Sequence, residues 1–323
     1  MQFSVIIPTL NRCGLLADAL VSARAQSFAN DQYEIIIVDN GSTDTTVQLA
    51  EQLKRDGGKA VRYVYEPRPG LHWARHAGAR TSNGEVLVYT DDDAIAHPDW
   101  LTNLAKAYAE LEADCAGGKI HIQWDRKPPA WIIPYEDVLG CLDYGLDMCL
   151  LGPDQYINGA NFSIRRDRLY QIGGFNPDQV GQYLIGDGET GLCRKIHQAG
   201  WRMAWVPDAL VWHRQIVETN GTLADLKRRF ANNGVSSAYD YYRRTRCCPR
   251  YLLRCAAQTA LRALDLKVRA LMRRPARDPA YYQHELYAAH FWEQSRYYLR
   301  LSYDERLREL VLREDWINEP ARD

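Results

Sequence analysis

The chain lacks several features that would assign it at once to a familiar class of protein. None of its 323 residues lies in a run approaching the roughly 18 apolar residues of a membrane-spanning helix. Its eight cysteines form no C-x-x-C pair, and their irregular spacing matches neither a disulfide framework nor a zinc site. A G-x-x-x-x-G-K-[S/T] phosphate loop is also missing. The cysteine spacing therefore favours reduced thiols, and the missing phosphate loop excludes the P-loop enzymes.

The opening apolar run, residues 3–7, is too short for the apolar region of a signal peptide, lacks a basic leader and stops at Pro8. We therefore expect a cytoplasmic location. The net charge of −1, from 40 basic and 41 acidic residues, argues against a general nucleic-acid binder.

This small net charge hides a strongly basic region near the C-terminus, where Asp265 is the only acid in 35 residues. The basic residues of this region are Arg243, Arg244, Arg246, Arg250, Arg254, Arg262, Lys267, Arg269, Arg273, Arg274 and Arg277. Leucines are interleaved with them, as in a basic amphipathic helix that lies on an anionic membrane surface. The alternative is a helix docked on the rest of the chain with its cations in water, and the sequence leaves both open.

Apolar runs alternate with helical patterns through the first 113 residues. The pattern predicts strands at 3–8, 33–39, 60–66 and 85–90, and helices at 15–26, 45–55 and 72–80. Because the strands are rich in Val and Ile without polar alternation, both of their faces should be covered, as in a mainly parallel sheet between helices. Ligands of such sheets bind beyond the carboxyl ends of the strands.

The pattern loosens from residue 114 and turns helical beyond residue 215. We expect strands at 115–124, 202–207 and 209–213, a strand leading into a short helix at 156–166, and a helix at 188–200. Four further helices are expected at about 222–244, 250–273, 279–300 and 303–317. The predicted organisation is an α/β catalytic domain over 1–215, with halves at 1–113 and 114–215, followed by a helical extension over 216–323.

Three consecutive aspartates, Asp91, Asp92 and Asp93, follow the fourth predicted strand. Adjacent carboxylates repel one another, so such a cluster is stable at a strand end only if it is solvated or neutralised by a cation. The cluster is therefore either a solvated turn or a metal site. An EF-hand is excluded, because Ala94 and Ile95 follow where that loop needs alternating acids and a glycine.

Taken in order, several segments of the chain resemble the family 2 glycosyltransferases, which have the GT-A fold. These segments are VIIPTLNR, EIIIVDNGSTD, GLHWARHAGAR, YTDDDAIAHPDWL, NGANFSIRRDRLYQIGGFN, and GDGETGLCRKIHQAG followed by VWH. The resemblance covers roughly residues 2 to 215 and does not clearly extend over the helical tail. It implies a metal-dependent, inverting transfer of a sugar from a nucleotide diphosphate, with UDP as the expected nucleotide. The expected acceptor is a saccharide or a lipid-linked saccharide in surface polysaccharide biosynthesis.

The resemblance matches the aspartates to the Asp-x-Asp motif of the family. It implies that Asp93 is the main metal contact, and that Asp91 and Asp92 contact the metal or the ribose. Hard oxygen ligands suit Mn²⁺ or Mg²⁺, and a cation beside the diphosphate would stabilise the charge of the leaving group. His213 is similar in place to a further metal ligand of many members, and an ordinary packed side chain is the alternative.

Asp39, which ends the second strand, is similar in place to the uracil-contacting aspartate of the family. Its alternative is an Asx-type turn over NGSTD. The resemblance places Pro8, Thr9, Arg12 and Arg75 in the rest of the donor pocket. Arginine suits either the base carbonyl or the diphosphate there.

An inverting transfer needs a carboxylate near the acceptor hydroxyl. The family usually offers Glu-Asp at the start of a helix, and counting back from LCRKIHQAG puts Glu189 where the catalytic Asp normally stands. Gly188 replaces the preceding Glu, which is a departure from the family. Asp187 is the alternative base, and Glu189 could instead merely favour the positive end of its helix.

The acceptor pocket is expected to include Asn161 and Arg165, from NGANFSIRRD, and Trp131 in a proline-rich loop. A loop tryptophan can stack on a sugar ring or simply pack against the protein. The altered base motif also keeps open a catalytically inactive family member that acts as a membrane-docked partner. A nucleotidyltransferase is less favoured, because PTLNRCGLL has a single glycine where its phosphate loop should be.

Overall fold

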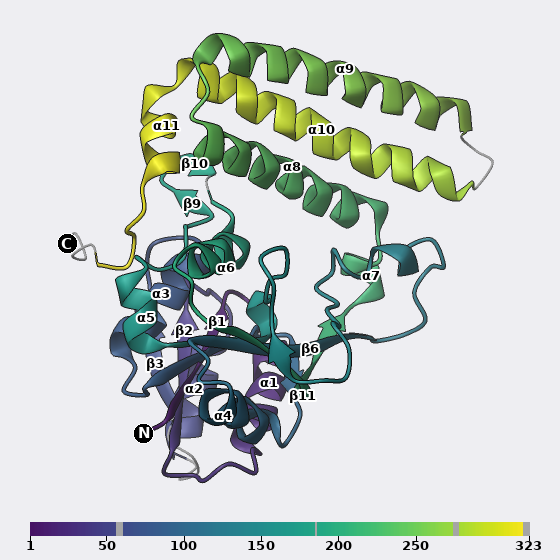
Figure 1. The fold of residues 1–323 in the computed structure, drawn as a ribbon. Helices are drawn as coiled ribbons and strands as arrows, with labels where there is room; N and C mark the ends of the chain where they lie inside the picture. The colour runs from purple at the N-terminus through teal and green to yellow at the C-terminus, as the bar shows by residue number, and fades with distance from the viewer. Residues whose placement is uncertain (56–60, 185, 274–277, 319–323) are drawn as a thin grey trace.

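The structure is a computed structural model that describes residues 1–55, 61–184, 186–273 and 278–318. A nine-stranded mixed sheet forms its centre, with the strand order β3-β2-β1-β4-β8-β6-β11-β5 and β7 paired to β11. Helices cover both faces of this sheet, and a layer of long helices lies beyond one of them (Figure 1). The predicted α/β sheet with a helical C-terminal extension is confirmed.

The first half of the sheet is parallel, as predicted. Its strands are β1 (Phe3–Thr9), β2 (Tyr33–Asp39), β3 (Val61–Tyr65) and β4 (Val86–Tyr89). Every residue of β1 and β2 is buried, which is why these strands read as continuous apolar runs. Because β1 lies between β2 and β4, the strand order reverses beside it, and this is where open α/β sheets bind ligands.

Helices from this half cover the two faces of the sheet. The helices α1 (Cys13–Arg24), α2 (Thr46–Arg55) and α4 (Trp100–Glu110) pack in one core cluster. The helix α3 (Leu71–Thr81) packs in the other, with α5 (Arg166–Gln171) and α6 (Gly188–Gln198). The helix α4 was not among the predicted elements.

The second half of the sheet is mixed. It contains β5 (Ala94–Ala96), β6 (Cys115–Trp124), β7 (Cys149–Leu150), β8 (Phe162–Arg165) and β11 (Met203–Gln215), and a hairpin of β9 (Gln179–Val180) and β10 (Tyr183–Leu184) lies apart. Two 3₁₀ turns, Ile133–Tyr135 and Gly159–Asn161, complete this half. The two strands predicted at 202–207 and 209–213 are one strand, β11. Its pairing with β6 shifts between Val206 and Val211, so the chain passes Pro207 without leaving the sheet.

The tail consists of α7 (Val217–Asn220), α8 (Leu223–Thr245), α9 (Pro249–Arg273), α10 (Pro279–Tyr303) and α11 (Glu305–Leu312). The three long helices lie side by side, with α8 nearest the sheet and α9 on the outside (Figure 1). The last predicted helix is shorter than the expected 303–317, since α10 extends to Tyr303 and α11 ends at Leu312. Arg274 and Arg277 of the basic region lie outside the described residues.

The tail packs against the sheet domain through aromatic side chains. Trp73 of α3 and Trp316 beyond α11 meet edge-on, with ring centroids 6.0 Å apart. Within the described residues, no helix is long and apolar enough to span a membrane.

Candidate active site

The acidic end of β4 meets the end of β1. Since β1 and β4 are paired neighbours, the residues that follow them lie at the same sheet edge. Thr9 Oγ1 donates to Asp92 Oδ2 over 2.7 Å. The guanidinium of Arg12 lies 3.2 Å from Asp92 and 2.8 Å from Asp93. The structure therefore brings these predicted donor and metal residues together.

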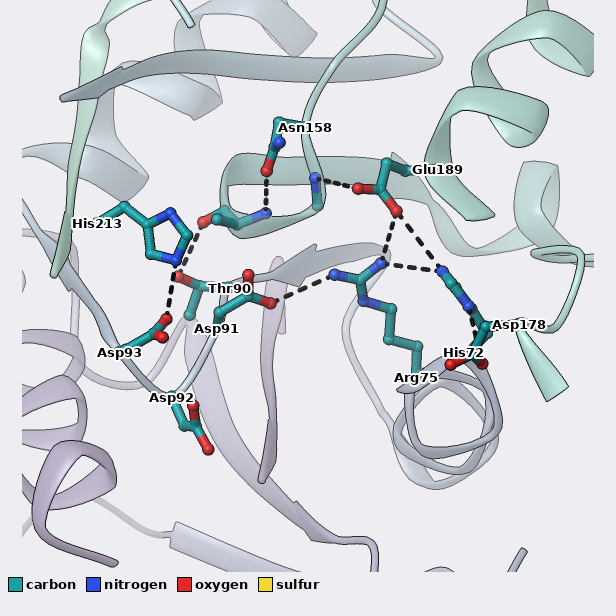
Figure 2. A network of polar contacts seen from close by, with 12 residues as sticks. His72, Arg75, Thr90, Asp91, Asp92, Asp93, Asn158, Asp178, Glu189 and His213 are labelled. Carbon is teal, nitrogen blue, oxygen red and sulfur yellow. Dashed lines mark hydrogen bonds and ion pairs between the residues drawn. The ribbon is translucent and has the colours of Figure 1, made fainter. Parts of the chain in front are cut away.

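His213 reaches the same place from a distant part of the chain. The antiparallel pairing of β5 with β11 sets His213 opposite Ala94, directly after Asp93. Its Nε2 lies 3.0 Å from Asp93 Oδ1, as Figure 2 shows. Asp91, Asp93 and His213 each offer one ligand atom, and these atoms lie within 4.8 Å of one another. Two carboxylates and an imidazole form a donor set that fits a divalent cation such as Mn²⁺.

Positive groups of the protein do not fully balance the negative charges of the carboxylates in this cluster. Burial raises the pKa of Asp92 to about 6, and the Asp93 charge adds to that, although Arg12 opposes it. Burial also raises the pKa of Asp91 against the attraction of Arg75. The pKa of Asp93 is instead lowered, because the hydrogen bond and charge of His213 outweigh its burial. A bound cation would favour the ionised form of all three.

Arg75 on α3 links this acidic cluster to the predicted base. Its side chain is 1% exposed, and its two terminal nitrogens lie 3.3 Å from Asp91 Oδ1 and 3.2 Å from Glu189 Oε2 (Figure 2). Gly159 gives it room, since a Cβ added there would lie 2.2 Å from the guanidinium. The buried guanidinium of Arg75 thus joins the acidic cluster to the candidate base, Glu189.

Glu189 stands in the first turn of α6 and has further partners. Its Oε1 accepts a hydrogen bond from the Gly159 backbone N–H over 3.3 Å, and its Oε2 lies 3.5 Å from His72 Nε2. The other nitrogen of His72 lies 3.3 Å from Asp178. Burial would raise the pKa of Glu189, but the His72 hydrogen bond and the Arg75 charge lower it well below its usual range. The carboxylate is therefore ionised.

The departure from the family at Gly188 has a local explanation. Gly188 has a φ of +50°, and a Cβ there would lie 2.6 Å from His72 Nε2. The imidazole of His72 therefore fills the space in which a side chain at position 188 would begin. Sequence reasoning missed His72, because its role appears only when α3 and α6 meet.

Asp187, the alternative base, is directed elsewhere. Its side chain is 4% exposed and accepts hydrogen bonds from Asn176 over 2.8 Å and from Arg194 over 2.7 Å. Both partners hold the carboxylate against the start of α6. Of the two acids, only Glu189 contacts Arg75 and His72.

The acidic cluster lines a cleft of about 610 Å³ at the switch point of the sheet, whereas His72, Arg75 and Glu189 are not among the residues that line it. Its lining includes Pro8, Thr9, Arg12, Asn40, Asp91, Asp92, Asp93, Asp178, Gln179, His213, Arg228 and Arg229. The tail supplies Arg228 and Arg229, and both bind Asp225 one turn earlier in α8. The sequence offered no signal for these two, because the resemblance ends before the tail.

Asp39 is buried at the end of β2 and is not among the residues that line this cleft. Its Oδ1 accepts hydrogen bonds from the backbone N–H groups of Gly41 and Ser42, and its Oδ2 accepts one from Tyr63 over 2.7 Å. These are the contacts of the Asx-type turn named above as the alternative to base recognition. The cleft wall is formed by the next residue, Asn40.

The predicted acceptor residues do not gather at the cleft. Asn161 is fully buried, and its side chain bonds Trp100 and two backbone carbonyls. Arg165 pairs with Val86 at the start of β4, which is the opposite end of that strand from the aspartates. Trp131 stacks on Tyr282 of α10, with ring centroids 4.3 Å apart. All three have structural contacts, so we leave them out of the proposed acceptor site.

The fold and the site define a class: a GT-A-like, mainly parallel sheet between helices, with three consecutive aspartates at its switch point. The chain belongs to glycosyl transferase family 2, whose model matches residues 4–173.

Two archaeal relatives from Haloferax volcanii align with most of the chain. Glycosyltransferase AglE is 23% identical over 65% of this chain and 66% of its own length. Glucosyl-dolichyl phosphate glucuronosyltransferase is 26% identical over 66% of this chain and 69% of its own length. The chain thus spans about two thirds of the length of these relatives.

Solved structures share the fold. A fragment of S. aureus TarS in complex with UDP-GlcNAc has a TM-score of 0.52 at 17% identity, over 72% of this chain and 66% of that one. The mannosyltransferase PcManGT from Pyrobaculum calidifontis, in complex with GDP-Man and Mn²⁺, has a TM-score of 0.53 at 20% identity. The match covers 93% of this chain and 72% of that one. The predicted GT-A fold is confirmed.

Proposed function

We propose that this chain is a metal-dependent, inverting glycosyltransferase that uses a nucleotide-diphosphate sugar, with UDP as the nucleotide. The acceptor is a saccharide or a lipid-linked saccharide. One observation carries the proposal: Arg75 binds both Asp91 of the candidate metal cluster and Glu189, the candidate base. A site for the leaving group and a proton acceptor are thereby held in a fixed relation.

The residues of the cleft suit the donor. Asp91, Asp93 and His213 would hold the cation, which when bound offsets charge on the diphosphate. Arg12 and Arg229 stand in the same cleft, where a guanidinium can pair with phosphate oxygens in a bidentate manner. The complexes of TarS with UDP-GlcNAc and of PcManGT with GDP-Man and Mn²⁺ support a nucleotide-sugar donor.

The proposed reaction is a single in-line displacement. The acceptor hydroxyl oxygen attacks the anomeric carbon from the face opposite the diphosphate, and the bond from that carbon to the diphosphate oxygen breaks. The nucleoside diphosphate leaves with the bonding electron pair. The hydroxyl proton passes to Glu189, which His72 and Arg75 keep ionised against the effect of burial. Positioning of both substrates in one cleft supplies the rest of the rate enhancement.

The test is a panel of nucleotide sugars with Mn²⁺, in which release of the nucleoside diphosphate is measured. We expect turnover with one UDP-sugar and a loss of at least about 100-fold in Asp93→Ala, since that change removes a ligand of the cation. Asp99→Ala, six residues away on the same segment and exposed, is the matched control and should keep full turnover.

Three results would contradict the proposal. Wild-type protein without turnover on any donor would favour the inactive, scaffolding member of the family. Turnover that is retained in Asp93→Ala would mean that Asp93 is not a ligand of the cation. Release of pyrophosphate from a nucleoside triphosphate and a sugar phosphate would instead identify a nucleotidyltransferase.

A further inference from the structure

The outer face of α9 carries apolar side chains that remain exposed. Six of them, between 48 and 80% exposed, lie along the helix: Leu253, Leu261, Leu264, Val268, Leu271 and Met272. The opposite side of α9 is buried and includes Leu252, Ala256 and Ala263. At 100° per residue, the six exposed side chains fall on one side of the helix. We refer to these six residues as the α9 stripe.

Cations accompany the α9 stripe. The helix contains six basic residues and one acid, Asp265. Lys267, Arg269 and Arg273 bind acidic partners, Glu285, Asp265 and Asp278 respectively. Among the described residues, the other three have no acidic partner, Arg250, Arg254 and Arg262, although Arg262 lies over the ring of Phe291. Exposed apolar groups and uncompensated cations therefore share one helix.

An apolar groove continues the α9 stripe toward α10. It has a volume of about 360 Å³ and is lined by Ala263, Leu264, Ala288 and Trp292, with Lys227, Lys267, Glu285 and Glu293 among its other lining residues. Leu264 belongs to both the groove and the stripe. Trp292 is 48% exposed, and an indole half in water is suited to the boundary between lipid and water.

We propose that α9 docks this protein on an anionic lipid bilayer, with the α9 stripe among the headgroups and the free arginines on acidic lipids. A basic amphipathic helix binds such surfaces through apolar burial and electrostatic attraction together. A second copy of the chain fits less well, because two cationic α9 faces would repel each other. Figure 1 shows α9 on the outside of the helical layer, away from the sheet. The proposal does not depend on the reaction at the cleft.

The test is co-sedimentation of the full chain with vesicles, without donor or metal. One set is phosphatidylcholine alone and the other contains 30% phosphatidylglycerol, where about 30% is chosen to give a clearly negative surface. Leu261→Glu with Leu264→Glu places two charges in the α9 stripe. Val21→Glu is the matched control, because Val21 on α1 is as exposed as Leu261, 68% against 67%. Arg250→Ala with Arg254→Ala removes two cations, and Arg306→Ala on α11 is their control.

Wild-type protein should sediment with the anionic vesicles and much less with the neutral ones, and added salt should release it. The Leu261/Leu264 variant should bind at least about tenfold more weakly, and each lost arginine should weaken binding about fivefold. Equal binding to both vesicles, no binding, or an equal loss in Val21→Glu would overturn the proposal. The proposal would also be overturned if the wild-type protein were a dimer that bound no vesicles and that the Leu261/Leu264 changes converted to a monomer. Circular dichroism of each variant separates loss of binding from loss of fold.

Discussion

The cleft edge of the sheet and the outer face of α9 depart from the usual distribution of side chains in opposite ways. At the cleft, charged groups are buried, as with Arg75 and Asp92. On α9, large apolar groups such as Leu261 are exposed. A buried charge lowers stability unless it is paired, as Arg75 is with Asp91 and Glu189, and a large exposed apolar patch is typical of a contact surface. The comparison teaches that both departures point to binding surfaces, an ionic one at the cleft and an apolar one on α9.

The largest effect should come from the buried side of this comparison. We expect Glu189→Gln to lower transfer by about 100- to 10,000-fold, because the amide cannot accept the hydroxyl proton. Nucleotide binding, measured by calorimetry, should survive. Asp187→Asn is the matched control and should retain most of the transfer activity, since Asp187 faces Asn176 and Arg194. Loss of transfer in Asp187→Asn with activity retained in Glu189→Gln would reverse the assignment.

Two leucines of α9 sharpen the comparison within one helix. Leu252→Ala should lower the free energy of unfolding by about 2–5 kcal/mol, because Leu252 is fully buried between the tail helices. Leu261→Ala should change it by less than about 0.5 kcal/mol, because that side chain already meets solvent. Urea denaturation measures both. A large loss in Leu261→Ala would mean that the protein itself covers this face.

A smaller effect is expected at the arginines that α8 of the tail supplies to the cleft. Arg229→Ala should raise the KM for the donor on the order of tenfold, because a hydrogen bond to a charged group contributes about 1.5–3 kcal/mol. The value of kcat should change less. Steady-state kinetics at saturating metal measure this, with Arg306→Ala as a surface control. An unchanged KM would exclude Arg229 from donor binding.

The smallest effect is a pH dependence at Lys195, where α6 contacts the chain beyond α11. Lys195 donates to the backbone carbonyls of Gly174 and Glu314, and burial lowers its pKa to about 8. The unfolded chain therefore binds more protons than the folded chain between pH 8 and the ordinary lysine pKa, so stability from this group rises with pH there. We expect wild-type protein to gain about 1 kcal/mol relative to Lys195→Met between pH 7 and 9. A constant difference across that range, in urea denaturation, would contradict it.

Much of the sheet could be predicted from the sequence, because buried parallel strands are continuous apolar runs. The single strand β11 could not, since Pro207 reads as a break and only the pairing with β6 shows that the chain continues. The helix α4 was also missed, although its buried residues Trp100, Leu104 and Tyr108 have helical spacing.

The candidate site was predictable where it depends on strand ends and less so where it depends on packing. The meeting of Thr9 with Asp92 follows from neighbouring parallel strands. The choice between Asp187 and Glu189 depends on side-chain direction in one helical turn, which no pattern encodes. His72 and Arg229 depend on how α3, α6 and α8 pack together, and tertiary contacts of this kind leave no local signal.

The irregularity in β11 has a consequence for the acidic cluster. Between Val206 and Val211, β11 advances five positions while β6 advances two, from Gly118 to Ile120. Because alternate side chains of a strand face opposite sides, a deletion or insertion of one residue here would present a neighbour of His213 to Asp93 instead. The length of a segment that contributes no residue to this group thus determines that an imidazole, rather than an indole or a guanidinium, lies beside Asp93.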